Sequence, residues 1–293
     1  MKTNDRNKNG LTEQEFLNQY QPKDYEKPSV TTDMLLFTID RDFKERQREA
    51  DDCKLKLLLI KRRDHPYINH WALPGGFMNM KESLDETAYR ELKEETNLQE
   101  DVYLEQLYTF SEPNRDPRMR VISTAYMALT PCENIKRTKA GDDAADAKWF
   151  TVSKTKVFDN DFSRMDLLEL SNEEANVSIQ YEVTYDYQKK TSVYKLAKDS
   201  KADLAFDHVE IIDMGIQRLR NKVSYTDIAF NLLPELFTLT TLQQVYEVLL
   251  GEELVKSNFR KKIAPLVIKT EQQRTDCGYH WPYLYRKNPK IRF

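Results

Sequence analysis

Cysteine is scarce in this chain, and long apolar runs are missing from it. The 293 residues include three cysteines, Cys53, Cys132 and Cys277, which lie far apart and are odd in number. This spacing predicts neither a disulfide framework nor a metal site of paired cysteines, so we expect a reduced, cytoplasmic protein. No run approaches the 18 apolar residues of a membrane span, and MKTNDRNKNGLTEQ lacks the apolar core of a secretory signal. We therefore expect no membrane association.

The charges are distributed unevenly along the chain. The net charge is −3 at pH 7, but ten lysines or arginines and only two acids fall between Leu254 and Phe293. The rest of the chain is therefore acidic. An acidic body with a basic end is typical of a protein whose end binds anions.

Hydrophobic periodicity divides the chain into three parts. Residues 1–28 are polar and predict an arm with one short helix over Thr12–Tyr20. Strands are predicted at 29–39, 55–60, 102–110, 119–129, 146–151 and 177–187, and a helix at 82–96. From Phe206 onward, apolar residues three and four apart predict helices at 208–219, 241–250 and 257–263, followed by a hairpin of VIKTEQQR and PYLYRKN. The pattern predicts an α+β fold, with an α/β domain at 29–203 and a helical domain with a terminal hairpin at 204–293.

Carboxylates crowd the predicted helix at 82–96. A tight turn is predicted ahead of it over Trp71–Gly76, because glycine permits backbone angles that other residues avoid. At about 100° per residue, Glu91 and Glu95 lie one turn apart, beside the apolar stripe of the helix, with Glu94 nearby. A cluster of oxygen ligands without His or Cys suits Mg²⁺ or Mn²⁺, and the chemistry it indicates is metal-assisted attack of water on phosphorus. The alternative is a solvated, salt-bridged helix face, because Glu and Lys are good helix formers.

The spacing of these residues resembles the Nudix box. Gly76 is followed after five residues by Glu82, and after seven more by RELKEETNL, whereas the box reads R-E-U-x-E-E-x-G-U with U aliphatic. Eight of the nine fixed positions match, and Asn97 stands where the family has Gly. Asn is the next residue most tolerant of the left-handed conformation that ends a helix.

The resemblance implies a Nudix α/β/α sandwich that hydrolyses a nucleoside diphosphate linked to another moiety, with Mg²⁺ or Mn²⁺ as cofactor. By position, Glu91, Glu94 and Glu95 would be catalytic residues and metal ligands. Arg90 would be a catalytic residue that orients these carboxylates, because its planar fork can hold a carboxylate or a phosphate. Glu82 would contact the groups around the metal without binding the metal itself.

Two segments downstream indicate the substrate. Pro113 follows Leu98 by 15 residues, which resembles the proline of ADP-ribose pyrophosphatases. The arginines Arg115, Arg118 and Arg120 are available for a pyrophosphate or a ribose, and each could equally be a surface charge. Arg118 and Arg120 alternate on the predicted strand and would point the same way.

Further candidates for the substrate site are Gly76, Asp142 and Asp143. The two aspartates belong to GDDAADAKWF, which resembles the loop and strand that close such sites, and they could contact metal or substrate or act as the base. Turn formation is the alternative for both. Glu133 is a weaker candidate base, and Tyr67, Trp71 and Phe77 could flank an adenine.

The C-terminal helices have the outline of a winged helix-turn-helix. Ser257 or Asn258 can cap a short helix, whose residues Lys256, Ser257, Asn258, Arg260, Lys261 and Lys262 could then approach DNA. The following hairpin adds Lys269, Arg274, Arg286 and Lys287. A contact between domains or protomers is the alternative for this basic segment.

The text from Ala205 to Ile263 resembles the C-terminal domain of NrtR-type regulators, which are Nudix-related transcription factors of NAD metabolism. This resemblance implies a homodimer whose winged helix binds double-stranded DNA and whose Nudix domain senses ADP-ribose-like ligands. We therefore expect a Mg²⁺-dependent Nudix hydrolase of ADP-ribose or a related compound, coupled to DNA binding. A non-catalytic, ADP-ribose-sensing repressor is the alternative, and removal of damaged nucleotides is a weaker one.

Overall fold

The structure, a computed structural model, describes residues 6–21, 26–42, 52–96, 102–137, 147–188, 190–197, 200, 203–274 and 282–291. Its helices are α1 (Glu13–Gln19), α2 (Leu84–Thr96), α3 (His208–Val223), α4 (Leu239–Leu250) and α5 (Lys256–Ile263). The first strands are β1 (Ser29–Asp42), β2 (Asp52–Lys61), β3 (Trp71–Ala72), β4 (Gly75–Phe77), β5 (Tyr103–Phe110) and β6 (Val121–Leu129). The later ones are β7 (Ala147–Asp159), β8 (Ser163–Ser171), β9 (Asn176–Asp186), β10 (Thr191–Leu196), β11 (Val267–Gln273) and β12 (Tyr283–Lys287).

The strands before α3 form one mixed sheet. Its order is β10-β9-β8-β7-β2-β1-β6-β5, with β3 added to β2 and β4 added to β1. The pairs are antiparallel except that of β1 with β6. This exception brings the beginnings of β1 and β6 together, where the site described below lies.

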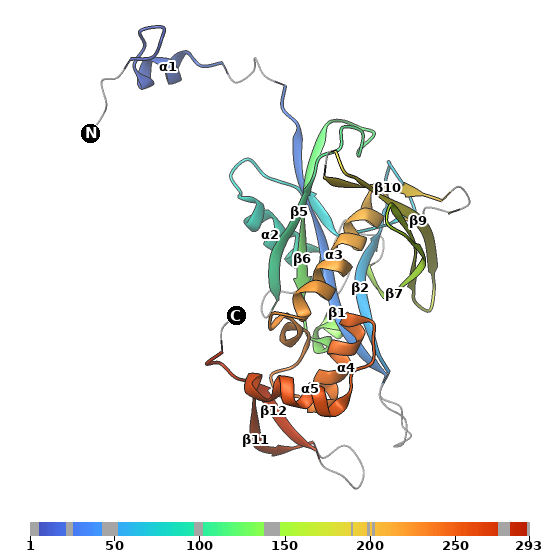
Figure 1. Cartoon of the computed structure of the whole chain (residues 1–293). Coiled ribbons are helices and arrows are strands. Elements are labelled where there is room, and N and C mark those ends of the chain that lie inside the picture. The colour runs from blue at the N-terminus through green and yellow to red at the C-terminus, as the bar shows by residue number, and fades with distance from the viewer. Residues whose placement is uncertain are drawn as a thin grey trace.

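Helices cover both faces of the sheet, as Figure 1 shows. Successive side chains of a strand point to opposite faces, so Leu35 and Phe37 of β1 pack into the core under α3. Met34 and Leu36 pack with Ala88 and Leu92 of α2 on the other face. The α/β/α sandwich expected from the sequence is therefore confirmed.

The C-terminal part consists of α4, α5 and a two-stranded hairpin of β11 and β12. The hairpin lies at the end of the molecule away from the sheet (Figure 1). One hydrophobic cluster runs from the sheet through α3 into α4 and α5. The boundary at residue 204 stays a prediction, and the packing of α3 on the sheet favours placing this helix with the Nudix part.

The sheet has strands that the sequence did not predict. β8 and β10 were not expected, and β7 extends well beyond residue 151. In β8, the inward-facing positions Asp166, Leu168 and Leu170 are buried. Because one of these three is a carboxylate, the alternation of apolar residues that identifies a half-buried strand is broken there.

Two local predictions near the site were also wrong. Gly75 and Gly76 lie in the short strand β4 rather than in a tight turn, and neither is among the residues with positive φ. Arg118 and Arg120 precede β6 rather than alternate on it. The backbone N–H of Arg118 donates to Asp116 Oδ1 at 2.9 Å, so a side chain that favours turns replaces the strand hydrogen bond there.

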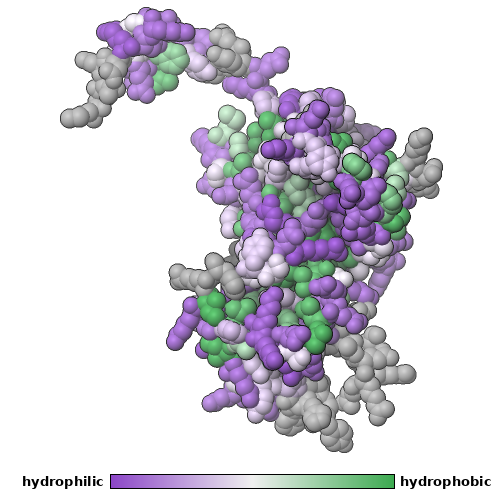
Figure 2. All heavy atoms as spheres, in the orientation of Figure 1, coloured by the Kyte–Doolittle hydropathy of each residue, from purple (hydrophilic) through white to green (hydrophobic). Residues whose placement is uncertain are grey.

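The N-terminal arm carries the predicted short helix, α1, which Thr12 and Glu15 cap reciprocally. Figure 1 shows the arm projecting away from the sheet. In Figure 2 hydrophilic residues dominate the visible face, with smaller hydrophobic groups, some near the C-terminal helices. Within the part of the chain that the structure describes, every helix is too short or too polar to cross a membrane.

Candidate ligand and DNA sites

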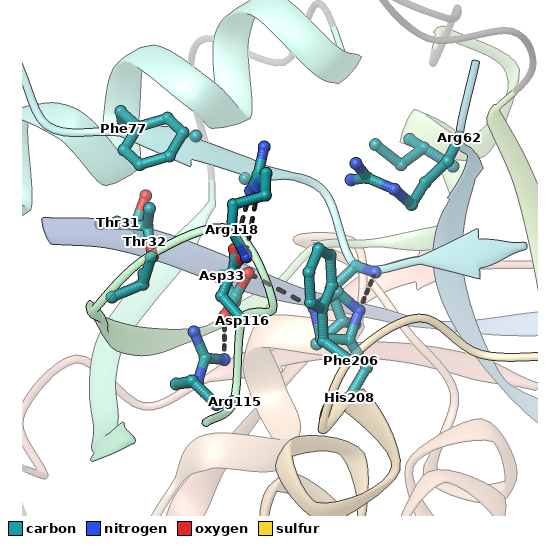
Figure 3. A pocket seen from close by; sticks show the side chains of 15 residues that line it. Thr31, Thr32, Asp33, Arg62, Phe77, Arg115, Asp116, Arg118, Phe206 and His208 are labelled. Atoms are coloured by element: carbon teal, nitrogen blue, oxygen red, sulfur yellow. Dashed lines mark hydrogen bonds and ion pairs between the residues drawn. The ribbon is translucent and has the colours of Figure 1, made fainter. Parts of the chain in front are cut away.

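A pocket opens where β1, β4 and the segment before β6 meet the start of α3. Its cavity measures about 160 Å³. The lining residues are Thr31, Thr32, Asp33, Ile60, Arg62, Leu73, Gly75, Gly76, Phe77, Arg115, Asp116, Arg118, Val121, Phe206 and His208. Figure 3 shows the charged and aromatic members converging on this space.

Three arginines line the cavity, and two of them, Arg62 and Arg118, lie near the aromatic rings of Phe77 and Phe206. Arg118 Cζ lies 5.7 Å from the ring centroid of Phe77 and 6.0 Å from that of Phe206. Arg62 Cζ lies 5.0 Å from the ring of Phe206. Burial, and then the positive charge of Arg118, lower the pKa of Arg62. An anion placed between the two arginines would relieve this repulsion, and the rings offer flat faces to a base.

An ionic network forms the floor of the pocket. Asp33 of β1 accepts a hydrogen bond from Ser123 Oγ at 2.5 Å and from Arg115 Nη2 at 3.3 Å. His208 Nδ1 accepts the backbone N–H of Leu73 at 2.9 Å, and its Nε2 lies 3.6 Å from Asp33 Oδ1. Burial alone would raise the pKa of Asp33, but His208, with Arg115 and Ser123, lowers it to about 2. Asp33 is therefore a permanent negative charge beneath the arginines.

On α2, one arginine gathers the carboxylates of the Nudix-like segment. Arg90 Nη1 donates to Glu91 Oε1 at 2.7 Å and to Glu94 Oε2 at 3.0 Å. Its Nε donates to Glu82 Oε1 at 2.9 Å, and hydrogen bonds from Arg90 and then Asn79 lower the pKa of Glu82 to about 2. The expectation that a cation sits among these carboxylates is met here by the guanidinium itself.

Gly76 makes room for the most buried of these carboxylates. A Cβ at Gly76 would lie 2.1 Å from Glu91 Oε1, a distance at which atoms overlap. Burial raises the pKa of Glu91, although Arg90 opposes the shift. Oε2 of Glu95, one turn further along α2, is enclosed as well. The fixed glycine of the box therefore serves close approach rather than an unusual backbone angle.

The donor set fits a hard divalent cation by its chemistry, since it consists of carboxylate oxygens beside a cradle that any Cβ would fill. In the arrangement described, however, no group of three or more His, Cys, Asp or Glu among the described residues is placed to hold a metal ion. Glu91 and Glu94 are both bonded to Arg90. A cation would have to compete with Arg90 for these two glutamates.

The C-terminal helices place basic side chains on an open surface. In α5, Phe259 and Ile263 are buried, and the exposed residues are Lys256, Ser257, Asn258, Arg260, Lys261 and Lys262. The expected caps were wrong, because α5 begins at Lys256 with Val255 as its N-cap residue and no side-chain cap. Ser257 and Asn258 therefore lie inside the first turn.

The hairpin is anchored to the helices that precede it. Phe237 and Tyr285 exchange backbone hydrogen bonds of 3.0 and 2.8 Å, and Lys287 pairs with Asp227. Lys269 Nζ lies 3.2 Å from the ring centroid of Tyr283. The hairpin is thus held by the segments that precede α4, and it follows α5 in the chain as expected of a winged helix.

Comparison with known proteins identifies both parts of the chain. Residues 47–169 match the NUDIX domain family, and residues 229–286 match the NrtR DNA-binding winged helix domain. A curated protein of Acinetobacter baylyi, the "ADPR responsive transcriptional repressor NtrR", is 31% identical over 281 residues, covering 95% of this chain and 89% of its own length. The chain belongs to the NrtR family. It consists of a Nudix domain followed by a winged helix domain.

Solved structures agree with membership of the NrtR family over most of the chain. A MutT/nudix family protein from Enterococcus faecalis is 32% identical, with a TM-score of 0.66 over 95% of this chain and 94% of that one. Shewanella oneidensis NrtR complexed with a 27mer DNA is 29% identical, with a TM-score of 0.59 over 89% and 94%. An ADP-ribose pyrophosphatase of Methanocaldococcus jannaschii matches a shorter part, with 42% identity over 98 residues, 33% of this chain and 56% of that protein.

The structure brings some of the predicted substrate residues of this NrtR-family chain together and separates others. Gly76 and Arg118 line the pocket. Arg120 is exposed outside the lining, and its Nη1 donates to the carbonyl of Glu112 at 3.1 Å. Asp142 and Asp143 lie outside the described residues.

Sequence reasoning did not single out Asp33, Arg62, Phe206 and His208. Asp33 carried a signal, since it is a lone carboxylate inside the apolar run SVTTDMLLFTI. Phe206 and His208 carried none, because only the fold brings the start of α3 to the pocket. Of the residues predicted to flank an adenine, Phe77 lines the pocket. Tyr67 lies outside the lining, with its ring centroid 4.8 Å from that of Phe206, and Trp71 is buried against Phe150. Their role in binding a base stays a prediction.

Proposed function

We propose that this chain is a DNA-binding transcriptional repressor whose Nudix domain binds ADP-ribose or a related nucleoside diphosphate derivative. The observation that carries the proposal is the pocket, in which paired guanidinium groups and aromatic rings adjoin the first turn of α3. The likeness over 95% of the chain to a repressor described as ADPR-responsive supports the same ligand.

Each group of the pocket has a role in this proposal. Arg62 and Arg118 hold the diphosphate by charge-assisted hydrogen bonds, and Phe77 and Phe206 stack against the base or cover the ribose. Asp116, bonded to Arg118 Nη2 at 2.8 Å, keeps the guanidinium oriented until the ligand arrives.

In the winged helix, we propose that α5 approaches DNA with the exposed side chains of Lys256, Ser257, Asn258, Arg260 and Lys261. Lys262 differs from these, since its Nζ lies 3.5 Å from the carbonyl oxygen of Ser224 at the end of α3.

The DNA proposal is tested by the double variant Arg260→Ala/Lys261→Ala. The probe is a fluorescent DNA duplex selected from a random-sequence library for binding to the full chain. If both side chains contact phosphates, the affinity of the variant for this duplex should fall at every salt concentration. The slope of log affinity against log salt should decrease by about 2. The control Lys156→Ala/Lys195→Ala removes the same charge from exposed positions on β7 and β10. An unchanged slope in the α5 variant would refute the phosphate contacts.

A second candidate function is hydrolysis of the bound ligand, and the retained glutamates of the box favour it. A divalent cation such as Mg²⁺, held by Glu91, Glu94 and Glu95, would supply charge neutralisation and an activated water. Arg90 would release Glu94 most readily, because that side chain is 58% exposed whereas Glu91 is 8% exposed. Glu82 would then retain Arg90 beside the site through its own hydrogen bonds.

Hydrolysis and binding are separated by assaying ADP-ribose with Mg²⁺ on the native chain and on Glu95→Gln, with calorimetric binding beside both. Turnover that falls by at least about a hundredfold in the variant, with binding kept, supports catalysis by the box. Binding without turnover in the native chain leaves a sensor only. Equal turnover in both chains would remove Glu95 from the metal site.

A homodimer and a cytoplasmic location remain proposals for this chain. Operators read by winged helix proteins are commonly paired half-sites that match a twofold protein. The molar mass of the full chain measured by light scattering in solution, with and without DNA, tests the dimer directly.

A further inference from the structure

The chain enters α3 through a strained turn that borders the pocket. Phe206 has φ of +52°, a left-handed conformation that costs free energy in a bulky residue unless its surroundings hold it. The backbone before it is fixed, since the N–H groups of Trp71 and Ala205 donate to Asp203 and Trp71 at 2.9 and 2.8 Å. Phe206 therefore stands between a fixed segment of backbone and the start of α3.

Asp207 holds the other side of this turn, and its side chain does not cap the helix. It occupies the N-cap position of α3 but makes no side-chain cap hydrogen bond, although Asp is a favoured capping residue. Its carboxylate accepts instead from Arg115 Nε at 2.8 Å and Nη2 at 2.6 Å. Arg115 is 5% exposed and lines the pocket. Asp207 thus has two competing partners, the Arg115 fork and the first turn of its own helix.

The far end of α3 contacts both helices of the winged helix domain. A Cβ on Gly251, the C-cap residue of α4, would lie 3.3 Å from Arg220 Nη2 of α3. Lys262 of α5 lies against the carbonyl of Ser224, the C-cap residue of α3. One continuous helix therefore runs from the pocket to α4 and α5 (Figure 1).

We propose that Arg115 is a positioning residue that couples the pocket to the winged helix through Asp207. In the free protein its fork holds Asp207, and with it the strained Phe206, in the arrangement described. A diphosphate held by Arg62 and Arg118 also draws the fork of Arg115, which lines the same pocket. Asp207 then turns to the first N–H groups of α3, and the turn relaxes. The helix α3 then tilts about Asp213, which stays bonded to the sheet, and Arg220 and Ser224 carry the motion to α4 and α5.

Charge favours this exchange in both directions. Without ligand, Asp207 and Asp33 neutralise the buried guanidinium of Arg115, which would otherwise lack a counterion. With ligand, the diphosphate supplies that charge, and the carboxylate of Asp207 is favourable at the positive end of the helix dipole. Both end states are thus satisfied electrostatically, as a two-state element requires.

The test is Asp207→Asn, which removes the charge pair and keeps a side chain that can cap a helix. Amide hydrogen exchange of the full chain is measured with and without ADP-ribose, and calorimetry gives the affinity. In the wild type, ADP-ribose should change exchange in the pocket segments and, by about fivefold or more, in α4 and α5. In Asp207→Asn the pocket response should remain, and the affinity should rise because the ligand no longer competes with a carboxylate for Arg115. The response of α4 and α5 should vanish.

Two further variants separate coupling from damage to the fold. Asp207→Glu restores a carboxylate for Arg115 and should regain part of the α4 and α5 response. Glu210→Gln removes a carboxylate one turn further along α3 and should leave the response intact. These variants compare the response of the pocket with the response of α4 and α5. If Asp207 had a merely structural role, its loss would not remove the α4 and α5 response selectively.

The outcomes distinguish this inference from the function on which it rests. A full α4 and α5 response in Asp207→Asn would overturn the role of the Arg115–Asp207 pair. A wild type in which only the pocket segments respond would overturn the coupling while leaving ligand binding in place. A wild type with neither binding nor any change in exchange would overturn the proposed function itself.

Discussion

Two ionic clusters lie on opposite faces of the sheet, and they are built in opposite ways. On the α2 face, Arg90 is one cation shared by three glutamates. On the α3 face, Asp213 is one carboxylate, fully buried, that takes hydrogen bonds from Lys154, Arg164, Tyr181, Tyr194 and Gln217. The first cluster has surplus negative charge, and the second has a complete set of donors.

The difference between the clusters indicates which charged side chains can exchange their partners. The residues of the Arg90 cluster come from one helix and its preceding loop, and Glu94 is well exposed, so a carboxylate can leave without moving the backbone. The donors to Asp213 come from β7, β8, β9, β10 and α3 itself, so any rearrangement would move the sheet. We therefore expect the Asp213 cluster to hold α3 on the sheet and the Arg90 cluster to adapt to a ligand.

The largest expected effect is that of Asp213→Ala. It leaves the buried side chain of Lys154 with Asp166 alone and Arg164 without its second carboxylate, and breaking a buried ion pair costs about 3–5 kcal/mol. Urea unfolding of the variant and the wild type measures the loss. Asp159→Ala is the control, because it removes the partner of Lys156 from an exposed pair and should cost at most about 0.5 kcal/mol. Similar losses for both variants would abolish the distinction between the clusters.

The two clusters also differ in how well the sequence predicts them. Glu91, Glu94 and Arg90 stand within five consecutive residues, and helical geometry alone places them side by side. Asp213, Lys154 and Tyr181 are separated by tens of residues and meet only through the strand order, which periodicity does not specify. The two unpredicted strands both belong to this cluster, since β8 supplies Arg164 and β10 supplies Tyr194. In β8, Asp166 interrupts the apolar alternation.

The candidate site was predictable to the same extent. The box helix, the sandwich and the winged helix followed from contiguous motifs, whereas the floor of the pocket did not. Asp33, Arg115 and His208 are brought together by the parallel pairing of β1 with β6 and by the return of the chain to Trp71 before α3. Such contacts are non-local, and a single sequence carries little information about them.

The next largest loss of stability is expected from alanine at Gly75, and a smaller one from alanine at the adjacent Gly76. Comparing the two variants tests whether the Arg90 cluster can rearrange. A Cβ at Gly75 would lie 2.1 Å from the backbone carbonyl of Thr32, so Gly75→Ala must displace β1 and should cost about 1–3 kcal/mol. At Gly76 the obstacle is the side chain of Glu91, which can swing away.

Gly76→Ala should accordingly cost less than about 1 kcal/mol, but it should lower any Mg²⁺-dependent hydrolysis strongly because Glu91 moves. Thermal unfolding and the ADP-ribose assay on both variants check the two halves of this prediction. A Gly76→Ala variant as unstable as Gly75→Ala would mean that Glu91 cannot swing away and that the Arg90 cluster does not adapt.

The smallest effect is expected for Glu210, which lies one turn before Asp213 on α3. The two carboxylates can be compared directly, because the surroundings of Glu210 are acidic. Burial, and then the negative charges of Asp207, Glu112 and Asp213, raise the pKa of Glu210 to about 7, with Arg115 opposing the shift. For Asp213, burial acts upward, but Lys154, Tyr181 and Arg164 lower the pKa below the ordinary 3.8.

The two groups should therefore give stability opposite dependences on pH. Between the ordinary pKa of 4.5 and about 7, the unfolded chain releases the proton of Glu210 while the folded chain keeps it. Its ionisation thus costs stability as pH rises through this range, and the loss is complete above pH 7. The stability that Asp213 contributes is present above its unfolded pKa and is lost as pH falls below it. Glu210→Gln should match the wild type in melting temperature near pH 4 and exceed it increasingly up to pH 8, and a difference independent of pH would show that Glu210 ionises in the fold as it does in water.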